Sequence, residues 1–159
     1  MPRVKVSRTI HASPNTVWEI ISDYKNISKF HPFLTHITPT GEIENGPGAI
    51  RQCHLKDGKT QTEEVIAWEE GRSITQRSVD APLMRHITGQ MIIDRLDEAL
   101  CRVTIDTRFV MKYGPLGWIL GTLVMAPALH HVLGQVLKGL QRYVETGEEI
   151  GPSAASLTS

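Results

Sequence analysis

An arginine and a glutamate on two neighbouring predicted strands are the residues of this sequence best suited to hold or transform a small molecule. Asp57-Gly58 is a strong signal for a two-residue hairpin turn, and such a turn places Arg51 directly opposite Glu64. The same register surrounds the pair with apolar residues, so we expect a cross-strand ion pair on the inner face of a sheet. A guanidinium there can donate paired N–H groups to a carboxylate, phenolate or carbonyl oxygen.

The Arg51 and Glu64 pair is open to three interpretations. It could orient the polar end of a bound ligand. Glu64 could instead act as a general acid or base while Arg51 polarises a carbonyl group. The third interpretation is a purely structural ion pair that closes one end of the sheet, because ion pairs perturb pKa values without being catalytic.

The other metal-binding and nucleophilic residue types are scattered along the chain. Cys53 and Cys101 have no CxxC spacing, and the adjacent His130 and His131 would point about 100° apart on a helix. We therefore predict no metal site and no cofactor. His31 and His36 flank a loop, where they either border a pocket or are ordinary surface residues.

Hydrophobic periodicity predicts an α+β fold. We expect a strand at 3–11, a helix at 14–23 with Ser13 as N-cap, a second helical turn at 26–30, about six antiparallel strands between 33 and 113, and a long helix ending near 145. This order indicates a curved antiparallel sheet wrapped around the C-terminal helix.

The inner face of that sheet is predicted to be a mostly apolar pocket. With a loop at 97–99, Ile93 faces Val103 and Met91 faces Ile105 on the inner side. For the strand at 72–79 both alternating sets remain open as the inner one. The predicted ligand-binding residues are Arg51, Glu64, Ile66, Trp68, Ile87, Met91, Ile105, Phe109, Met111, Tyr113 and Met125.

The first part of the C-terminal helix is apolar on more than one side. Trp118, Leu120 and Val124 would serve as a homodimer interface, as a lid over the pocket, or as a patch that touches a membrane transiently. The apolar run is shorter than the about 20 residues of a membrane span. Pro127 removes the hydrogen bond to Leu123, so a kink is expected there.

Composition points to one domain without nucleic-acid partners. The 159 residues include 17 Lys+Arg and 17 Asp+Glu, so the net charge is zero and no basic field attracts a phosphate backbone. We predict a single domain over 1–147 and a disordered tail over 148–159. The two unpaired cysteines and the polar, alternating N-terminus favour a cytoplasmic location.

Several short motifs resemble the START-like (SRPBCC) superfamily. They are the Ser-Pro-x-x-Val-Trp segment at 13–18, Phe30-His31-Pro32, and Gly48-Ala49-Ile50-Arg51 followed by Glu64-Val65-Ile66. In particular the chain is similar to the polyketide cyclase/dehydrase and lipid-transport branch, which shares its fold with the birch-pollen allergen. The resemblance implies a helix-grip fold, in which a seven-stranded antiparallel sheet grips a long C-terminal helix around a hydrophobic tunnel.

The resemblance implies less about function than about fold. Members bind lipids, sterols, quinones or polyketides, and some catalyse cyclisation or dehydration. Our leading hypothesis is binding of a hydrophobic small molecule of lipid, quinone or polyketide type. The alternative is a small polyketide cyclase or dehydratase that uses Glu64 and Arg51, so whether the chain is an enzyme stays open.

Overall fold

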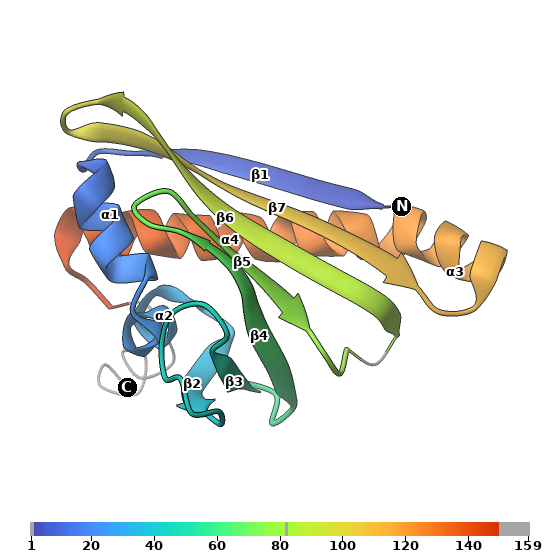
Figure 1. Cartoon of the computed structure of the whole chain (residues 1–159). Helices are drawn as coiled ribbons and strands as arrows, with labels where there is room; N and C mark the ends of the chain where they lie inside the picture. The colour runs from blue at the N-terminus through green and yellow to red at the C-terminus, as the bar shows by residue number, and fades with distance from the viewer. Residues whose placement is uncertain (1, 82, 150–159) are drawn as a thin grey trace.

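A seven-stranded antiparallel sheet and one long helix form the structure, a computed structural model that describes residues 2–81 and 83–149. The elements are β1 (Arg3–Ile10), α1 (Pro14–Ile21), a 3₁₀ turn (Tyr24–Asn26), α2 (Ile27–Phe30), β2 (Leu34–Pro39), β3 (Ile50–Leu55), β4 (Thr60–Glu69), β5 (Ser73–Ser78), β6 (Met84–Asp97), β7 (Leu100–Met111), α3 (Gly114–Leu120), a π-helical segment (Gly121–Met125) and α4 (Ala126–Thr146). The expected α+β helix-grip architecture is confirmed (Figure 1).

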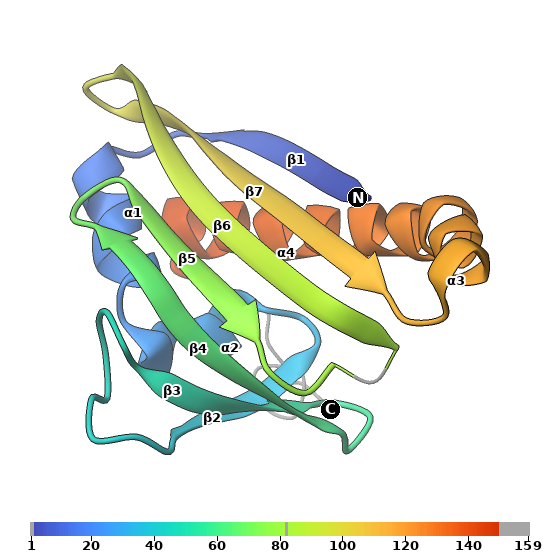
Figure 2. The same cartoon turned by 45° about the vertical axis from the view of Figure 1, so that its right-hand side comes forward.

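The helix α4 covers only part of the concave face of the sheet. The strand order is β1-β7-β6-β5-β4-β3-β2, and α4 packs against β1 and the two short helices. Figures 1 and 2 show α4 running beside β1, with β2, β3 and β4 at the opposite edge of the sheet. The middle strands therefore have a concave face that the long helix does not fill.

Local sequence signals account for the first helices and for the longest hairpin. The Ser13 side chain accepts the Thr16 amide and Pro14 occupies the first turn, as expected for the start of α1. In the β6–β7 hairpin Ile93 pairs with Val103 and the expected register is confirmed along the strands. The turn itself is shorter than predicted, because Asp97 pairs with Leu100.

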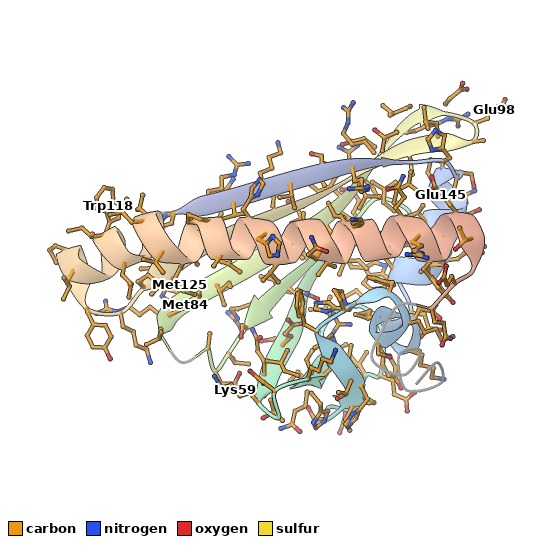
Figure 3. All side chains as sticks on the ribbon, turned by 180° about the vertical axis from the view of Figure 1, so that it is seen from behind. Lys59, Met84, Glu98, Trp118, Met125 and Glu145 are labelled. Atoms are coloured by element: carbon orange, nitrogen blue, oxygen red, sulfur yellow. The ribbon has the colours of Figure 1, made fainter. Side chains whose placement is uncertain are left out.

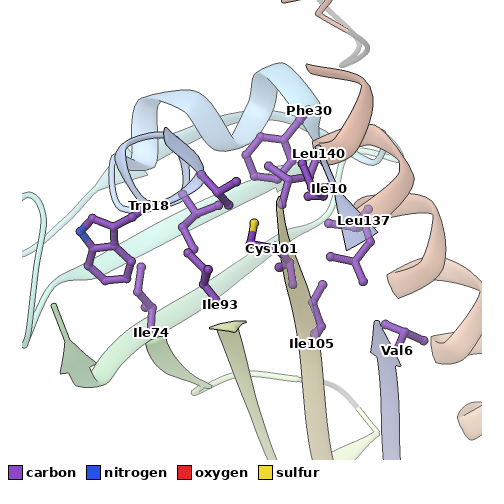
Figure 4. Close-up of a cluster of buried hydrophobic side chains, with 14 of the residues drawn as sticks. Val6, Ile10, Trp18, Phe30, Ile74, Ile93, Cys101, Ile105, Leu137 and Leu140 are labelled. Atoms are coloured by element: carbon purple, nitrogen blue, oxygen red, sulfur yellow. The ribbon is translucent and has the colours of Figure 1, made fainter. Parts of the chain in front are cut away.

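The main core lies between the sheet, α1, α2 and the C-terminal half of α4. Figure 4 shows side chains from these elements converging, among them Phe30, Cys101, Leu137 and Leu140. Each of these four is at most 1% exposed. A second, smaller cluster around Phe109 packs the other end of the sheet against the beginning of α4.

One carboxylate on the outer face of the sheet is largely buried. Asp106 is only 8% exposed. Arg3 binds both of its oxygens, at 2.8 and 2.6 Å, and this pairing holds the pKa of the Asp106 carboxyl below its usual value.

A π-helical segment, Gly121–Met125, lies immediately before Pro127, where the sequence predicted a kink. The Ala126 amide donates to the Gly121 carbonyl, five residues back, so the turn widens immediately before the proline. Pro127 then lies in the first turn of α4, directly after the widened turn. The chain continues as one helical rod from Gly114 to Thr146.

The predicted tail is described only in its first residues. Glu148 accepts two hydrogen bonds from the Arg142 guanidinium, at 2.9 and 3.2 Å. The remainder of the predicted tail, 150–159, lies outside the described residues.

Two glycines, Gly117 and Gly121, allow the start of the helical rod to pack closely against the end of β7. We therefore expect Gly117→Ala to destabilise the protein. A Cβ at Gly117 would lie 1.8 Å from the Lys112 carbonyl oxygen, and one at Gly121 would lie 2.8 Å from Met111 Cγ. The clash at Gly117 is with backbone, so the free energy of unfolding should fall by at least about 2 kcal/mol in urea titrations.

The matched control is Gly134→Ala in the same helical rod. A Cβ there meets no atom within 4 Å. Alanine should therefore raise the free energy of unfolding by about 0.5–1 kcal/mol through helix propensity. Equal stability of Gly117→Ala and wild type would contradict the close packing.

Candidate functional site

A cavity of about 240 Å³ lies where α4 leaves the concave face of the sheet uncovered. Apolar side chains from the sheet, α2 and α4 form most of its wall, and a few polar side chains from β3, β4 and β5 form one side. The lining includes Ile21, Ile27, Phe30, His31, Leu34, Ile37, Arg51, Cys53, Leu55, Gln61, Glu63, Ile74, Gln76, Ser78, Ile87, Met91, Ile105, Thr107, Leu129, Leu133 and Val136. Its volume is below the about 300–1,000 Å³ of typical ligand pockets, so it fits a compact molecule.

The register of the β3–β4 hairpin differs by one residue from the prediction. Arg51 pairs with Glu63, and Glu64 lies opposite Ile50. The loop has three residues, because the Leu55 amide donates to the Lys59 carbonyl at 2.8 Å and Gly58 takes a left-handed φ of 90°. Since strand side chains alternate between faces, this shift exchanges the inner and outer residues of β4.

Arg51 is a buried cation whose hydrogen bonding is incomplete. Its residue is 7% exposed, and Nη2 donates to the Gln76 side-chain oxygen and lies 3.6 Å from a Glu63 carboxylate oxygen. The Nε group is buried and finds no hydrogen-bond partner among the described residues. One donor of the guanidinium thus remains unsatisfied within a cavity wall, which is uncommon in folded proteins.

Glu63 and Cys53 complete the polar group beside Arg51. The Glu63 side chain is 19% exposed, so it keeps some contact with solvent. Burial, together with the charge of Glu63, raises the pKa of the Cys53 thiol. Cys53 is consequently a neutral thiol, unsuited to nucleophilic attack at neutral pH.

His31 contributes a neutral imidazole to the cavity wall. Burial lowers its pKa to about 4, and its Nδ1 accepts the Phe33 amide at 3.2 Å. Accepting at Nδ1 leaves the ring proton on Nε2. Of the two loop histidines considered from the sequence, His31 lines the cavity, whereas His36 is exposed and stacks on His54 at 3.9 Å.

Glu64 and Ile66 were assigned to the inner face, and this placement is wrong. Glu64 lies on the outer face and accepts a hydrogen bond from Arg77 at 2.6 Å. Ile66 is 45% exposed, because the register shift turns it outward together with Glu64; a bulge between Val65 and Ala67 lies at the same position.

The other predicted ligand-binding residues divide into three groups. Arg51, Ile87, Met91 and Ile105 line the cavity. Phe109 and Met111 are buried in the second core cluster, where Met125 packs against them. Trp68 stacks edge-on against Trp18 at 5.2 Å, and Tyr113 is 67% exposed beside α3. Neither of these last two forms part of the cavity wall.

Sequence reasoning missed Glu63 as a cavity residue, and it left both Gln76 and His31 as open alternatives that the structure now places in the cavity wall. A three-residue loop at Lys56-Asp57-Gly58, in place of the two-residue turn, predicts that Glu63 points inward. Gln76 belongs to the inner set of β5 with Ile74, one of the two sets left open. No pattern in the sequence signals the low pKa of His31.

The described part of the chain contains no cluster of side chains that could form a metal site. Over 2–81 and 83–149, no group of three His, Cys, Asp or Glu residues is arranged to hold an ion.

The fold and the enclosed polar group define a helix-grip protein with an internal cavity. A family model described as polyketide cyclase / dehydrase and lipid transport matches residues 1–145, so the chain belongs to this family. No protein of curated function shows significant similarity to the sequence.

Solved structures share this fold at low sequence identity. XoxI from Bacillus cereus superimposes with a TM-score of 0.75 at 18% identity, covering 92% of this chain and 97% of that one. BexL, a di-domain ARO/CYC from the BE-7585A biosynthetic pathway, gives 0.76 at 14% identity, covering 91% of this chain and 47% of BexL. DynU16, from the dynemicin biosynthetic locus, gives 0.72 at 18% identity, covering 94% of this chain and 49% of DynU16.

The imidazole of His31, which lies in the cavity wall, should make stability depend on pH between about 6.5 and 4. Above pH 6.5 the ring is neutral in both the folded and the unfolded protein. As the pH falls, the ring is protonated first in the unfolded chain, whereas in the folded protein it stays neutral until about pH 4. The free energy of unfolding should therefore decrease over this window by up to about 3 kcal/mol, levelling off below it.

Urea titrations of His31→Asn test this pH dependence. The asparagine oxygen can accept the Phe33 amide in place of Nδ1, so the fold is preserved while the titration disappears. His86→Asn, at an exposed position on β6, is the control and should retain the wild-type slope. Identical pH profiles for His31→Asn and wild type would contradict the assignment.

Proposed function

We propose that this protein binds a compact hydrophobic molecule in the cavity between the sheet and α4, with Arg51 holding an oxygen of that molecule. The observation that carries the proposal is the buried Arg51 Nε without a partner among the described residues. Leaving a buried donor unsatisfied costs about 1–3 kcal/mol, and more for a charged group. An acceptor oxygen on a ligand would remove that cost.

The charges around Arg51 favour a ligand with a carboxylate, phenolate or quinone-type oxygen. Glu63 offsets the guanidinium charge at 3.6 Å, while Gln76 is neutral and Cys53 stays protonated. The site is thus a partly neutralised cation in an apolar wall, which suits an anionic or strongly polarised oxygen.

The cavity size favours a ring system over a whole membrane lipid. Its about 240 Å³ are bounded by aliphatic side chains such as Ile87, Met91 and Leu133. A quinone head group or a small aromatic polyketide combines apolar rings with one or two polarised oxygens. The family includes both lipid transport and polyketide chemistry in its description, which agrees with this ligand class.

A second candidate is a cyclase or dehydratase, with Glu63 in the role first considered for Glu64. The observation in its favour is that the Glu63 carboxylate lines the cavity and lies beside Arg51. A carboxylate can remove a proton next to a carbonyl that a guanidinium polarises, and the Nε2–H group of the neutral His31 can donate a hydrogen bond to the substrate oxygen. BexL, a structural neighbour, is an ARO/CYC protein.

Replacing Arg51 by methionine should abolish preferential binding of acidic ring compounds. With 2-naphthoate as the probe in isothermal titration calorimetry, we expect the affinity of Arg51→Met to fall by about 10- to 100-fold, since a charge-assisted hydrogen bond is lost. The neutral analogue 2-naphthylmethanol should lose much less. Arg77→Met, on the outer face of β5, is the matched control and should bind like wild type.

Equal naphthoate affinity for Arg51→Met and wild type would overturn the anchor role of Arg51. Absence of binding by the wild type would leave that comparison without a signal, so native mass spectrometry of the purified protein comes first. A bound small molecule, released by organic extraction and identified, then replaces naphthoate as the probe.

Glu63→Gln separates binding from catalysis. If the protein only binds, the variant should hold the extracted compound about as well as wild type, and neither should change it. If the cyclase interpretation holds, wild type should convert a poly-β-ketone substrate and Glu63→Gln should lose about 100-fold or more in kcat while binding persists. Wild-type activity in Glu63→Gln would contradict the catalytic interpretation.

A further inference from the structure

We propose that the end of the molecule formed by α3 and the π-helical segment docks on the surface of a bilayer that contains anionic lipids. This end, named here the apolar tip, consists of Leu116, Trp118, Ile119, Leu120, Leu123 and Val124, which are between 39% and 73% exposed. The inference concerns the outer surface and does not depend on which molecule fills the cavity.

The apolar tip projects from the rest of the fold. Figures 1 and 2 show α3 extending past the end of β7, at the opposite end of the molecule from the β6–β7 turn. In Figure 3 Trp118 and Glu98 mark these two ends. Only the glycine side of the tip is covered, where Gly117 and Gly121 are buried against the end of β7.

The exposed side chains of the tip surround the helix instead of forming one flat face. At about 100° per residue, Leu116, Trp118, Ile119 and Leu120 are spread over more than half of the helix circumference. A second copy of the chain would cover one side of such a projection, whereas lipid covers every side that enters it. Trp118 and the neighbouring Tyr113, 67% exposed, are also the aromatic types enriched at membrane interfaces.

The charge around the tip suits an anionic surface. The sequence contains no Asp or Glu from Thr107 to Val144, and the exposed Lys112 directly precedes the turn into α3. The exposed Arg85 is at the same end, because the Lys112 amide donates to the carbonyl of Leu83, two residues before it.

Two carboxylates lie on the adjoining strand and loop. Asp106 is paired with Arg3, and Asp80 is an exposed carboxylate that accepts the amide of Thr62. A basic rim around an apolar tip is the combination that binds acidic membranes.

The tip is too short to cross a bilayer. The helical rod Gly114–Thr146 has 33 residues and is apolar enough to span by length and composition, with 11% of its most apolar window buried. Its C-terminal half, however, supplies Val136, Leu137 and Leu140 to the core. The seven residues of α3 and the five of the π segment extend only about 18 Å, against about 30 Å of hydrocarbon, so they can enter one leaflet.

Vesicle flotation of the full chain tests the proposal. Wild type should float with phosphatidylcholine vesicles that contain phosphatidylglycerol and bind pure phosphatidylcholine vesicles at least about fivefold more weakly. High salt should reduce the binding to acidic vesicles, because it screens Lys112 and Arg85. The double variant Leu116→Ser/Leu123→Ser should bind about tenfold more weakly than wild type.

Leu96→Ser is the matched control. Leu96 is 42% exposed near the β6–β7 turn, at the end of the molecule away from the tip, so its replacement should leave vesicle binding unchanged. All three altered positions are exposed, and unchanged thermal unfolding will show that the variants are folded.

Two outcomes would overturn the proposal. One is a wild type that binds no vesicle but forms a dimer by light scattering, with dissociation in Leu116→Ser/Leu123→Ser; the tip would then be a subunit interface. The other is equal binding of both lipid compositions by wild type and the double variant, which would show that the tip does not carry the interaction. Neither outcome affects naphthoate binding by Arg51, so failure here is distinct from failure of the cavity proposal.

Discussion

The structure depends on one packing constraint: a single helix cannot fill the concave face of a seven-stranded sheet. The buried stripe of α4, with Val136, Leu137 and Leu140, packs against the strands near β1. The helices α1 and α2 cover one end of the sheet. The inner side chains of the middle strands are only partly covered by the helices, and a space remains between them and α4. The cavity is therefore a direct consequence of the width of the sheet, and the side chains of β3 to β6 decide what it can hold.

Placing a guanidinium in that space has an energetic cost that shapes the site. An isolated buried charge is strongly disfavoured, and Arg51 is tolerated because Glu63 lies opposite it on β4 and the side chain of Gln76 reaches it from β5, the strand beyond. The compensation is partial, since Nε remains without a partner among the described residues. The same apolar surroundings keep His31 neutral and Cys53 protonated, so Arg51 and Glu63 are the charged groups that face a ligand.

The two ends of the helical rod differ in burial and in what they contact. Its C-terminal half stabilises the fold by burial, whereas its first turns expose apolar side chains and approach β7 closely through Gly117 and Gly121. The π-helical segment joins these halves and accommodates Pro127 without interrupting the rod. Leu129 and Leu133 belong both to the second core cluster and to the cavity wall, so the packing around the tip is continuous with the cavity.

The sequence by itself determined the element order, the helix-grip architecture and the β6–β7 register, because long alternating strands have only one register that buries their apolar side. It also identified Arg51 as an inner cation, since the alternation along β3 does not depend on its partner. It could not decide which residue pairs with Arg51. The local energies of a two-residue and a three-residue loop at Asp57-Gly58 differ little, yet the choice between them exchanges Glu63 and Glu64 between the faces of the sheet. The bulge at Ile66 and the low pKa of His31 likewise arise only when distant elements pack together, and so tertiary structure alone decided which polar groups meet in the cavity.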